Sequence, residues 1–247
     1  MAWQPSDPDS SVNSSGWNGR GSDVEVAQRT DMAARFSTRM FGWMSAGLGL
    51  SGAVAAGVLT NQSMLEFVAG WFYPLIILEL VMVFGFTALL KRMSFAAAAG
   101  AFLSYAAVNG LTLGLVVAMY TRESVATTFF ISAGTFGTMA LVGATTKRDL
   151  TSMGSFLIMG IWALILAGIV NIFLHSSPLQ FAISAVGALI FTGLTAYDVQ
   201  RFRKLGYLGF HTKEEEGKVA IIAALNLYLD FINLFLSLLR LFGNRRN

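Results

Sequence analysis

The sequence contains no cysteine and only two histidines among its 247 residues. Without cysteine the chain can form neither disulfides nor thiolate metal sites, and it has no thiol nucleophile. The histidines, His175 and His211, stand in separate polar connectors, and no grouping of His, Asp and Glu has the spacing of metal ligands. We therefore expect no cofactor and no resident metal ion.

Charged residues are scarce as well. They make up 13% of the chain, against about 25% in a typical soluble domain, while hydrophobic residues make up 55%. A chain with this composition could not cover a water-facing surface, so lipid must face much of it. The basic residues flank apolar runs, which indicates topology signals at a membrane surface and not a nucleic-acid partner.

Familiar catalytic motifs are also missing. No serine stands in a GxSxG sequence, and neither a P-loop nor a dinucleotide-binding GxGxxG follows a predicted strand. We therefore expect that the protein is not an enzyme.

The chain does contain long apolar runs. A bilayer core of roughly 30 Å requires about 20 apolar residues in a helix. Seven runs meet this requirement, at about residues 40–60, 70–90, 95–119, 126–145, 154–174, 180–200 and 219–242. Short connectors make successive helices antiparallel neighbours. The sequence thus predicts an all-α integral membrane protein, with one seven-transmembrane-helix bundle over residues 39–247.

The first 38 residues differ in composition from the rest. They are rich in Ser, Gly, Asn and Asp, as in SDPDSSVNSSGWNGRGSD, and cannot bury enough apolar area to offset the entropy of ordering. We expect residues 1–38 to form a disordered tail, of which residues 24–39 could form a short surface helix. The first apolar run begins near Met40, too late for a cleavable signal peptide, so we expect an uncleaved anchor.

Lysine and arginine alternate between the connectors in a way that predicts the topology. They precede the first run and follow the second, fourth and sixth runs, which places the N-terminus in the cytoplasm. Arg240, Arg245 and Arg246 disagree with this pattern if the seventh run crosses the membrane fully. Either the last helix departs from the rule, or it is re-entrant, and the sequence leaves both possibilities open.

Three acidic residues lie within the predicted spans. Glu79 falls near the middle of the second, Asp198 near the cytoplasmic end of the sixth, and Asp230 near the middle of the seventh. A charge inside the bilayer is costly, so each of these residues is a functional candidate.

The seventh run also carries a polar stripe, because its polar residues are spaced so that they share one helix face. These residues are Asn226, Asp230, Asn233, Ser237 and Arg240. Such a stripe must face the bundle interior or a watery path. Two interpretations of this stripe are open. Its side chains line a route for ions or protons, or they form a static hydrogen-bond network inside the bundle.

Asp198 and Asp230 would form a proton-sensitive latch if they met. Two carboxylates close together in a low dielectric cannot both ionise easily, and such a pair shares a proton near neutral pH. A straight helix of 1.5 Å per residue places Asp230 about halfway across and Asp198 near the inner boundary. Direct contact therefore requires helix tilt, a shifted boundary or a last helix that starts deeper.

Three segments together resemble the Bax inhibitor-1 family, also called the transmembrane Bax inhibitor motif family, and its bacterial members in particular. They are TTKRDLTSMGSFL (145–157), FTGLTAYDVQRFR (191–203) and ALNLYLDFINLFLSLLRLFG (224–243). The resemblance covers about residues 39–247. It implies a bundle of seven helices in which the last helix is central and surrounded by the other six.

The resemblance also implies a function. Bacterial members of the family are pH-sensitive calcium leak channels, and Asp198 and Asp230 match the aspartate pair whose protonation governs opening. A basic latch residue matches Arg92 best and Lys91 next, while Glu79 resembles the family's acidic residue in the second span. Calcium is then the transported ion, passing transiently near the aspartate pair. The candidates for lining its path are Glu79, Asn226, Asn233 and Ser237.

The resemblance allows a second function. Some bacterial members modulate a membrane-anchored AAA protease, and eukaryotic members suppress cell death. The alternative to a calcium leak is therefore a regulatory membrane protein that binds such a protease or a cell-death or stress partner. For either function we expect a multi-pass protein of a bacterial inner membrane, surrounded by lipid.

Overall fold

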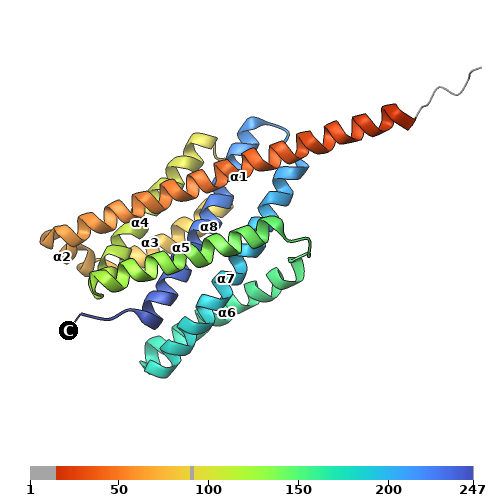
Figure 1. Cartoon of the computed structure of the whole chain (residues 1–247). Helices are drawn as coiled ribbons and strands as arrows, with labels where there is room; N and C mark the ends of the chain where they lie inside the picture. The colour runs from red at the N-terminus through yellow and green to blue at the C-terminus, as the bar shows by residue number, and fades with distance from the viewer. Residues whose placement is uncertain (1–14, 90–91, 247) are drawn as a thin grey trace, which may run out of the picture.

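The structure is a computed structural model that describes residues 15–89 and 92–246, and Figure 1 shows a bundle of long helices. Lys91, one of the predicted latch residues, lies outside the described residues, as do residues 1–14. The helices are α1 (Ser15–Thr60), α2 (Gln62–Gly70), α3 (Phe72–Leu89), α4 (Phe95–Ala118), α5 (Arg122–Thr145), α6 (Thr151–Leu174), α7 (Ser177–Leu208) and α8 (Lys213–Phe242).

Seven of the described helices are long and apolar enough to cross a membrane, namely α1 from Asp23 onward and α3 to α8. The remaining helix, α2, has only nine residues and connects α1 to α3. The prediction of an all-α membrane protein with seven spans is confirmed.

The last helix, α8, is the centre of the bundle. In its most apolar stretch 67% of the residues are buried inside the protein, against 6% in α3 and in α6. It packs against α1, α4, α5 and α7, whereas α3 packs mainly on α4 and α6 mainly on α7. The central position expected for the last helix is confirmed, and α3 and α6 are the peripheral helices.

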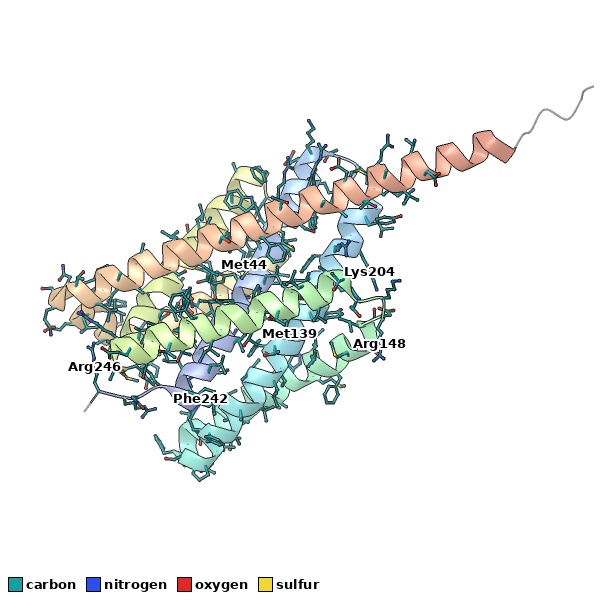
Figure 2. All side chains as sticks on the ribbon, in the orientation of Figure 1. Met44, Met139, Arg148, Lys204, Phe242 and Arg246 are labelled. Atoms are coloured by element: carbon teal, nitrogen blue, oxygen red, sulfur yellow. The ribbon has the colours of Figure 1, made fainter. Side chains whose placement is uncertain are left out.

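Helix α8 crosses the whole bundle without turning back. Near its start, the Arg39 guanidinium of α1 donates a 3.0 Å hydrogen bond to Glu216 and forms an ion pair with it. Beyond its end, the Thr121 amide donates to the Asn244 carbonyl at 2.9 Å, so the C-terminal segment pairs with the α4–α5 connector. Figure 2 shows Phe242 and Arg246 at one end of the bundle and Lys204 at the other. The re-entrant alternative is therefore wrong.

Helix α1 begins earlier than the composition predicts. Residues 15–38 belong to the segment that we expected to be a disordered tail, with a short surface helix allowed at residues 24–39. They are helical and continuous with the first span, and their N-terminal part projects beyond the bundle in Figure 1. Ala33 and Phe36 are buried, and the Phe36 ring lies 5.1 Å from that of Phe210 just beyond α7. The packed domain therefore starts near residue 33, because these apolar side chains dock against the end of α7.

Small residues allow α4 to approach α1 closely. A Cβ atom at Gly110 would lie 2.8 Å from the Ser51 carbonyl oxygen, and one at Gly114 would lie 2.8 Å from Cβ of Val58. Glycine at these positions lets two helices of the same chain come together.

Candidate functional site

The structure brings Asp198 and Asp230 to one interface, between α7 and α8. Both residues are buried, with 7% and 6% of their surfaces exposed. Their carboxyl groups lie close enough to interact electrostatically. The two residues that the sequence singled out as a pair therefore do face the same part of the bundle.

The register of α7 against α8 explains how the two aspartates meet. A Cβ atom at Gly187 would lie 2.9 Å from Oγ of Ser237, which fixes one point of contact. The two helices run antiparallel, and the sequence distance from Gly187 to Asp198 equals that from Ser237 back to Asn226. Asp198 is therefore level with Asn226, which is one helical turn from Asp230 on α8. Because α7 continues to Leu208, beyond the predicted end at residue 200, Asp198 also lies well inside its helix.

The aspartate pair has few polar neighbours. Oδ2 of Asp230 is buried and has no hydrogen-bond partner among the residues that the structure describes. Arg201, further along α7, is exposed, and no ion pair joins it to Asp198 among the described residues. A buried carboxylate without a hydrogen bond or a close cation is costly in its charged form. The energy of this interface therefore depends on whether the pair holds a proton.

The predicted basic latch is not brought to the pair. Arg92 is exposed just after α3, and no ion pair joins it to Asp198 in the part of the chain that the structure describes.

The other members of the polar stripe behave differently from one another. Ser237 is buried against α7 at Gly187, and Asn226 is half-buried. The side-chain amide of Asn233 donates to the Leu229 carbonyl of its own helix at 2.8 Å. Arg240 is exposed near the end of α8. Within the stripe, the amide of Asn233 therefore forms its hydrogen bond inside α8, whereas Ser237 and Asp230 lie at the interface with α7.

Glu79 belongs to a second polar cluster, on the other side of α8. Its two carboxylate oxygens accept hydrogen bonds from α4, at 2.6 Å from the Thr112 hydroxyl and at 3.0 Å from the Asn109 amide. The Tyr228 hydroxyl donates to Oδ1 of Asn109 at 2.7 Å and lies 2.7 Å from Oγ of Ser51. We call these five residues the Glu79 network. It joins α3, α4, α8 and α1.

Four members of this network were not predicted from the sequence. Ser51, Asn109, Thr112 and Tyr228 are uncharged, so they did not stand out as charges in apolar runs do. The available signal was that Asn109 and Thr112 are polar and lie three residues apart, which places them on one face of a helix.

Two of the segments that carry the family resemblance meet at the α5–α6 connector. The side chain of Gln200 on α7 accepts from the Leu150 amide at 2.9 Å and donates to the Arg148 carbonyl at 2.8 Å. Lys204 Nζ lies 2.8 Å from Oδ1 of Asp149, and Figure 2 shows Lys204 and Arg148 at the same end of the bundle. Hydrogen bonds from Lys204 and Thr151 lower the pKa of Asp149 to about 2.

A tightly coordinated metal would need several ligands close together. Among the residues that the structure describes, there is no group of three or more His, Asp or Glu side chains that could hold a metal ion.

Six apolar helices together with a central, largely buried α8 define a multi-pass integral membrane protein. The chain belongs to the Bax inhibitor-1 family, because the family model described as "Inhibitor of apoptosis-promoting Bax1" matches residues 33–247. This match starts at Ala33, where α1 becomes buried, and so includes residues that we had assigned to the tail.

Individual relatives agree with the family. The chain is 44% identical to an uncharacterized protein of Borreliella burgdorferi over 216 residues, covering 86% of this chain and 93% of the relative. It is 40% identical to the inner membrane protein YbhL of Escherichia coli K12 over 229 residues, covering 91% of this chain and 97% of the relative. An uncharacterized protein of Deinococcus radiodurans is 41% identical over 217 residues, covering 88% of this chain and 93% of the relative.

Proposed function

We propose that this protein is a pH-sensitive calcium leak channel, gated by the protonation of Asp198 and Asp230. The observation that carries the proposal is the buried carboxyl pair at the α7–α8 interface, in which Oδ2 of Asp230 has no hydrogen-bond partner among the described residues. We further propose that the protein lies in a bacterial inner membrane with its N-terminus in the cytoplasm.

Protonation decides how α7 and α8 pack in this mechanism. A shared proton leaves the pair with a single negative charge, which removes the repulsion between the carboxyl groups and stabilises the closed interface. Loss of that proton leaves two negative charges that repel strongly in a low dielectric. The helices then separate, and the carboxylates become available to a hard cation.

The side chains around the pair suit calcium, which prefers oxygen ligands. Asn226 and Ser237 supply neutral oxygens on the same side of α8, and Asn233 lies between them in sequence. Glu79 adds a second acidic group within the bundle. Arg92 would act as the latch only after α3 moves toward Asp198, and Lys91 stays the second candidate for that role.

Calcium flux into dye-loaded proteoliposomes between about pH 6 and 8 tests this proposal. Wild-type flux should rise with pH, and both Asp198→Asn and Asp230→Asn should flatten that dependence. Asp149→Asn is a matched control, because it removes a carboxylate in a connector outside the pair. Absence of flux above that of empty liposomes at every pH would refute the calcium leak.

The projecting part of α1 supports a second candidate function. At 1.5 Å per residue, a helix of 46 residues is far longer than a bilayer core of roughly 30 Å. Exposed apolar residues such as Val24 and Val26 lie on the projecting part. This segment could bind a membrane-anchored AAA protease or another partner.

A truncation separates the two functions. Deletion of residues 1–28 leaves Ala33 and Phe36 in place, so the bundle should fold and the calcium flux should persist. Loss of co-purification with the AAA protease would then support the regulatory function. Loss of flux with retained folding would count against an independent bundle channel.

A further inference from the structure

A cavity of about 640 Å³ lies among α1, α4, α5 and α8. Its volume is within the range of about 300–1,000 Å³ that is typical of ligand pockets. The inner wall includes Ser51, Leu113 and Phe231, all of which are buried. The cavity therefore reaches the core of the bundle, beyond the layer of lipid that surrounds any membrane protein.

The cavity opens toward the bilayer between α1 and α5. Both helices pack on α8, but they make little contact with each other. Leu59 of α1 and Phe130 of α5 line the cavity and are 44% and 72% exposed. Because these rim side chains are large and apolar, the opening suits a hydrocarbon chain entering from the membrane.

Two arginines line the same cavity, at the end where the C-terminal segment pairs with the α4–α5 connector. They are Arg122, at the first position of α5, and Arg246. The backbone amide of Arg246 donates to the Met119 carbonyl at 2.9 Å. This bond holds Arg246 at the end of the bundle where Figure 2 labels it. Guanidinium groups disfavour calcium at this position and are well suited to bind phosphate.

We propose that this cavity binds an anionic phospholipid of the bilayer, with one acyl chain inside and the phosphate on Arg122 and Arg246. The combination of an apolar interior, an opening to the membrane and two cations at one end selects this occupant. A neutral hydrocarbon would leave the arginines without an anion, and a free anion would leave the apolar interior unfilled.

Gly52 provides a way to fill the cavity without disturbing the helix packing. It lines the cavity on α1, and a Cβ atom there would meet nothing within 4 Å. Gly52→Leu should therefore occupy part of the space where the acyl chain would lie. Gly49→Leu is the matched control, because Gly49 is on the same helix, is equally open and does not line the cavity.

Arg122→Gln/Arg246→Gln removes the proposed phosphate contacts. Arg245→Gln is its control, since Arg245 precedes Arg246 in the same segment and does not line the cavity. Thermal unfolding of each variant in detergent confirms that it is folded before binding is compared.

The measurement is native mass spectrometry of the full chain with dioleoyl phosphatidylglycerol or dioleoyl phosphatidylcholine. Wild type should retain one phosphatidylglycerol about tenfold better than phosphatidylcholine. Gly52→Leu should reduce retention of both lipids, and the double arginine variant should abolish the preference between them. The two control variants should match wild type.

Three results would overturn the proposal. One is equal retention of the two lipids by wild type, and another is unchanged retention in the folded Gly52→Leu variant. The third is full displacement of phosphatidylglycerol by its water-soluble headgroup, glycerophosphoglycerol, because the site would then bind the phosphate without the chain. Each result is independent of calcium flux, so the lipid site can fail while the proposed channel function stands.

Discussion

The Tyr228 hydroxyl on α8 donates a 2.7 Å hydrogen bond to Oδ1 of Asn109 on α4, and the amide of Asn109 donates to Glu79 on α3. Since α3 packs mainly on α4, these bonds connect the outer helix to the central one. Both Tyr228 and Asn109 are buried, so their hydrogen bonds cannot be replaced easily by water.

Removal of the Tyr228 hydroxyl should destabilise the bundle. Tyr228→Phe leaves Oδ1 of Asn109 without its donor, and an unsatisfied buried polar group costs about 1–3 kcal/mol. Thermal unfolding in detergent should show a lower midpoint. Tyr105→Phe is the control, because its ring lies 5.9 Å from that of Tyr228 and no described residue bonds to its hydroxyl. Equal midpoints for both variants would contradict the role of the network.

The sequence predicted the spans well because the lipid bilayer imposes one simple rule on every crossing segment. Charge within an apolar run is equally visible, which is why Glu79, Asp198 and Asp230 were identified. The contact between Ser51 and Tyr228 was not predictable, because it joins residues 177 positions apart through tertiary packing. Uncharged polar residues give no local sign of such a partner.

The start of the domain was missed for a related reason. The composition of residues 15–38 is that of a disordered segment, and composition does not report the apolar side chains that dock on another helix. Ala33 and Phe36 are only two such residues, but they are buried against α7 at Gly206.

The meeting of Asp198 with Asp230 was also not predictable from the sequence alone. It depends on the length of α7 and on its register against α8, and hydropathy does not determine either of these to within one helical turn.

Close packing of α5 against α7 gives a second stability prediction. A Cβ atom at Gly143 would clash with the carbonyl oxygen of Ala196. Because that atom is backbone and cannot rotate away, Gly143→Ala should destabilise the protein by about 1–3 kcal/mol. Gly137→Ala on the same helix meets nothing within 4 Å. It should be neutral or slightly stabilising in the same unfolding measurement, and a loss as large as that of Gly143→Ala would refute the packing argument.

The absence of cysteine allows a direct test of the α7–α8 interface. The Cβ position of Gly187 lies 3.7 Å from Cβ of Ser237, within the usual range of about 3.5–4.5 Å for a disulfide. Gly187→Cys/Ser237→Cys should therefore cross-link on mild oxidation, as a mobility shift on a gel. If opening separates α7 from α8, the oxidised double variant should lose most of its calcium flux at every pH, and reduction should restore it.

Single-cysteine variants control for the substitutions in that experiment. Gly187→Cys alone and Ser237→Cys alone should each show the same flux with and without oxidant, whatever the effect of the substitution itself. Failure of the double variant to cross-link would contradict the register. Cross-linking with unchanged flux would show that this end of the α7–α8 interface stays closed during opening.

Asp149 should take no part in pH sensing between pH 6 and 8. Hydrogen bonds from Lys204 and Thr151 lower its folded-state pKa from 3.8 to about 2, so it stays ionised throughout that interval. A lowered folded pKa stabilises the protein above about pH 4, and this contribution is lost as the pH falls toward 2. Asp149→Asn should therefore leave the pH midpoint of calcium flux unchanged.

The Asp149–Lys204 pair should instead be detected by unfolding measurements at different pH and salt. Both side chains are more than half exposed, at 68% and 55%, so the stabilisation is small and screened by salt. The difference in unfolding midpoint between wild type and Asp149→Asn should be present at pH 7, shrink in high salt and disappear near pH 2. A flux midpoint that moves in Asp149→Asn would place a pH sensor at the α5–α6 connector and remove the unique role proposed for the buried aspartates.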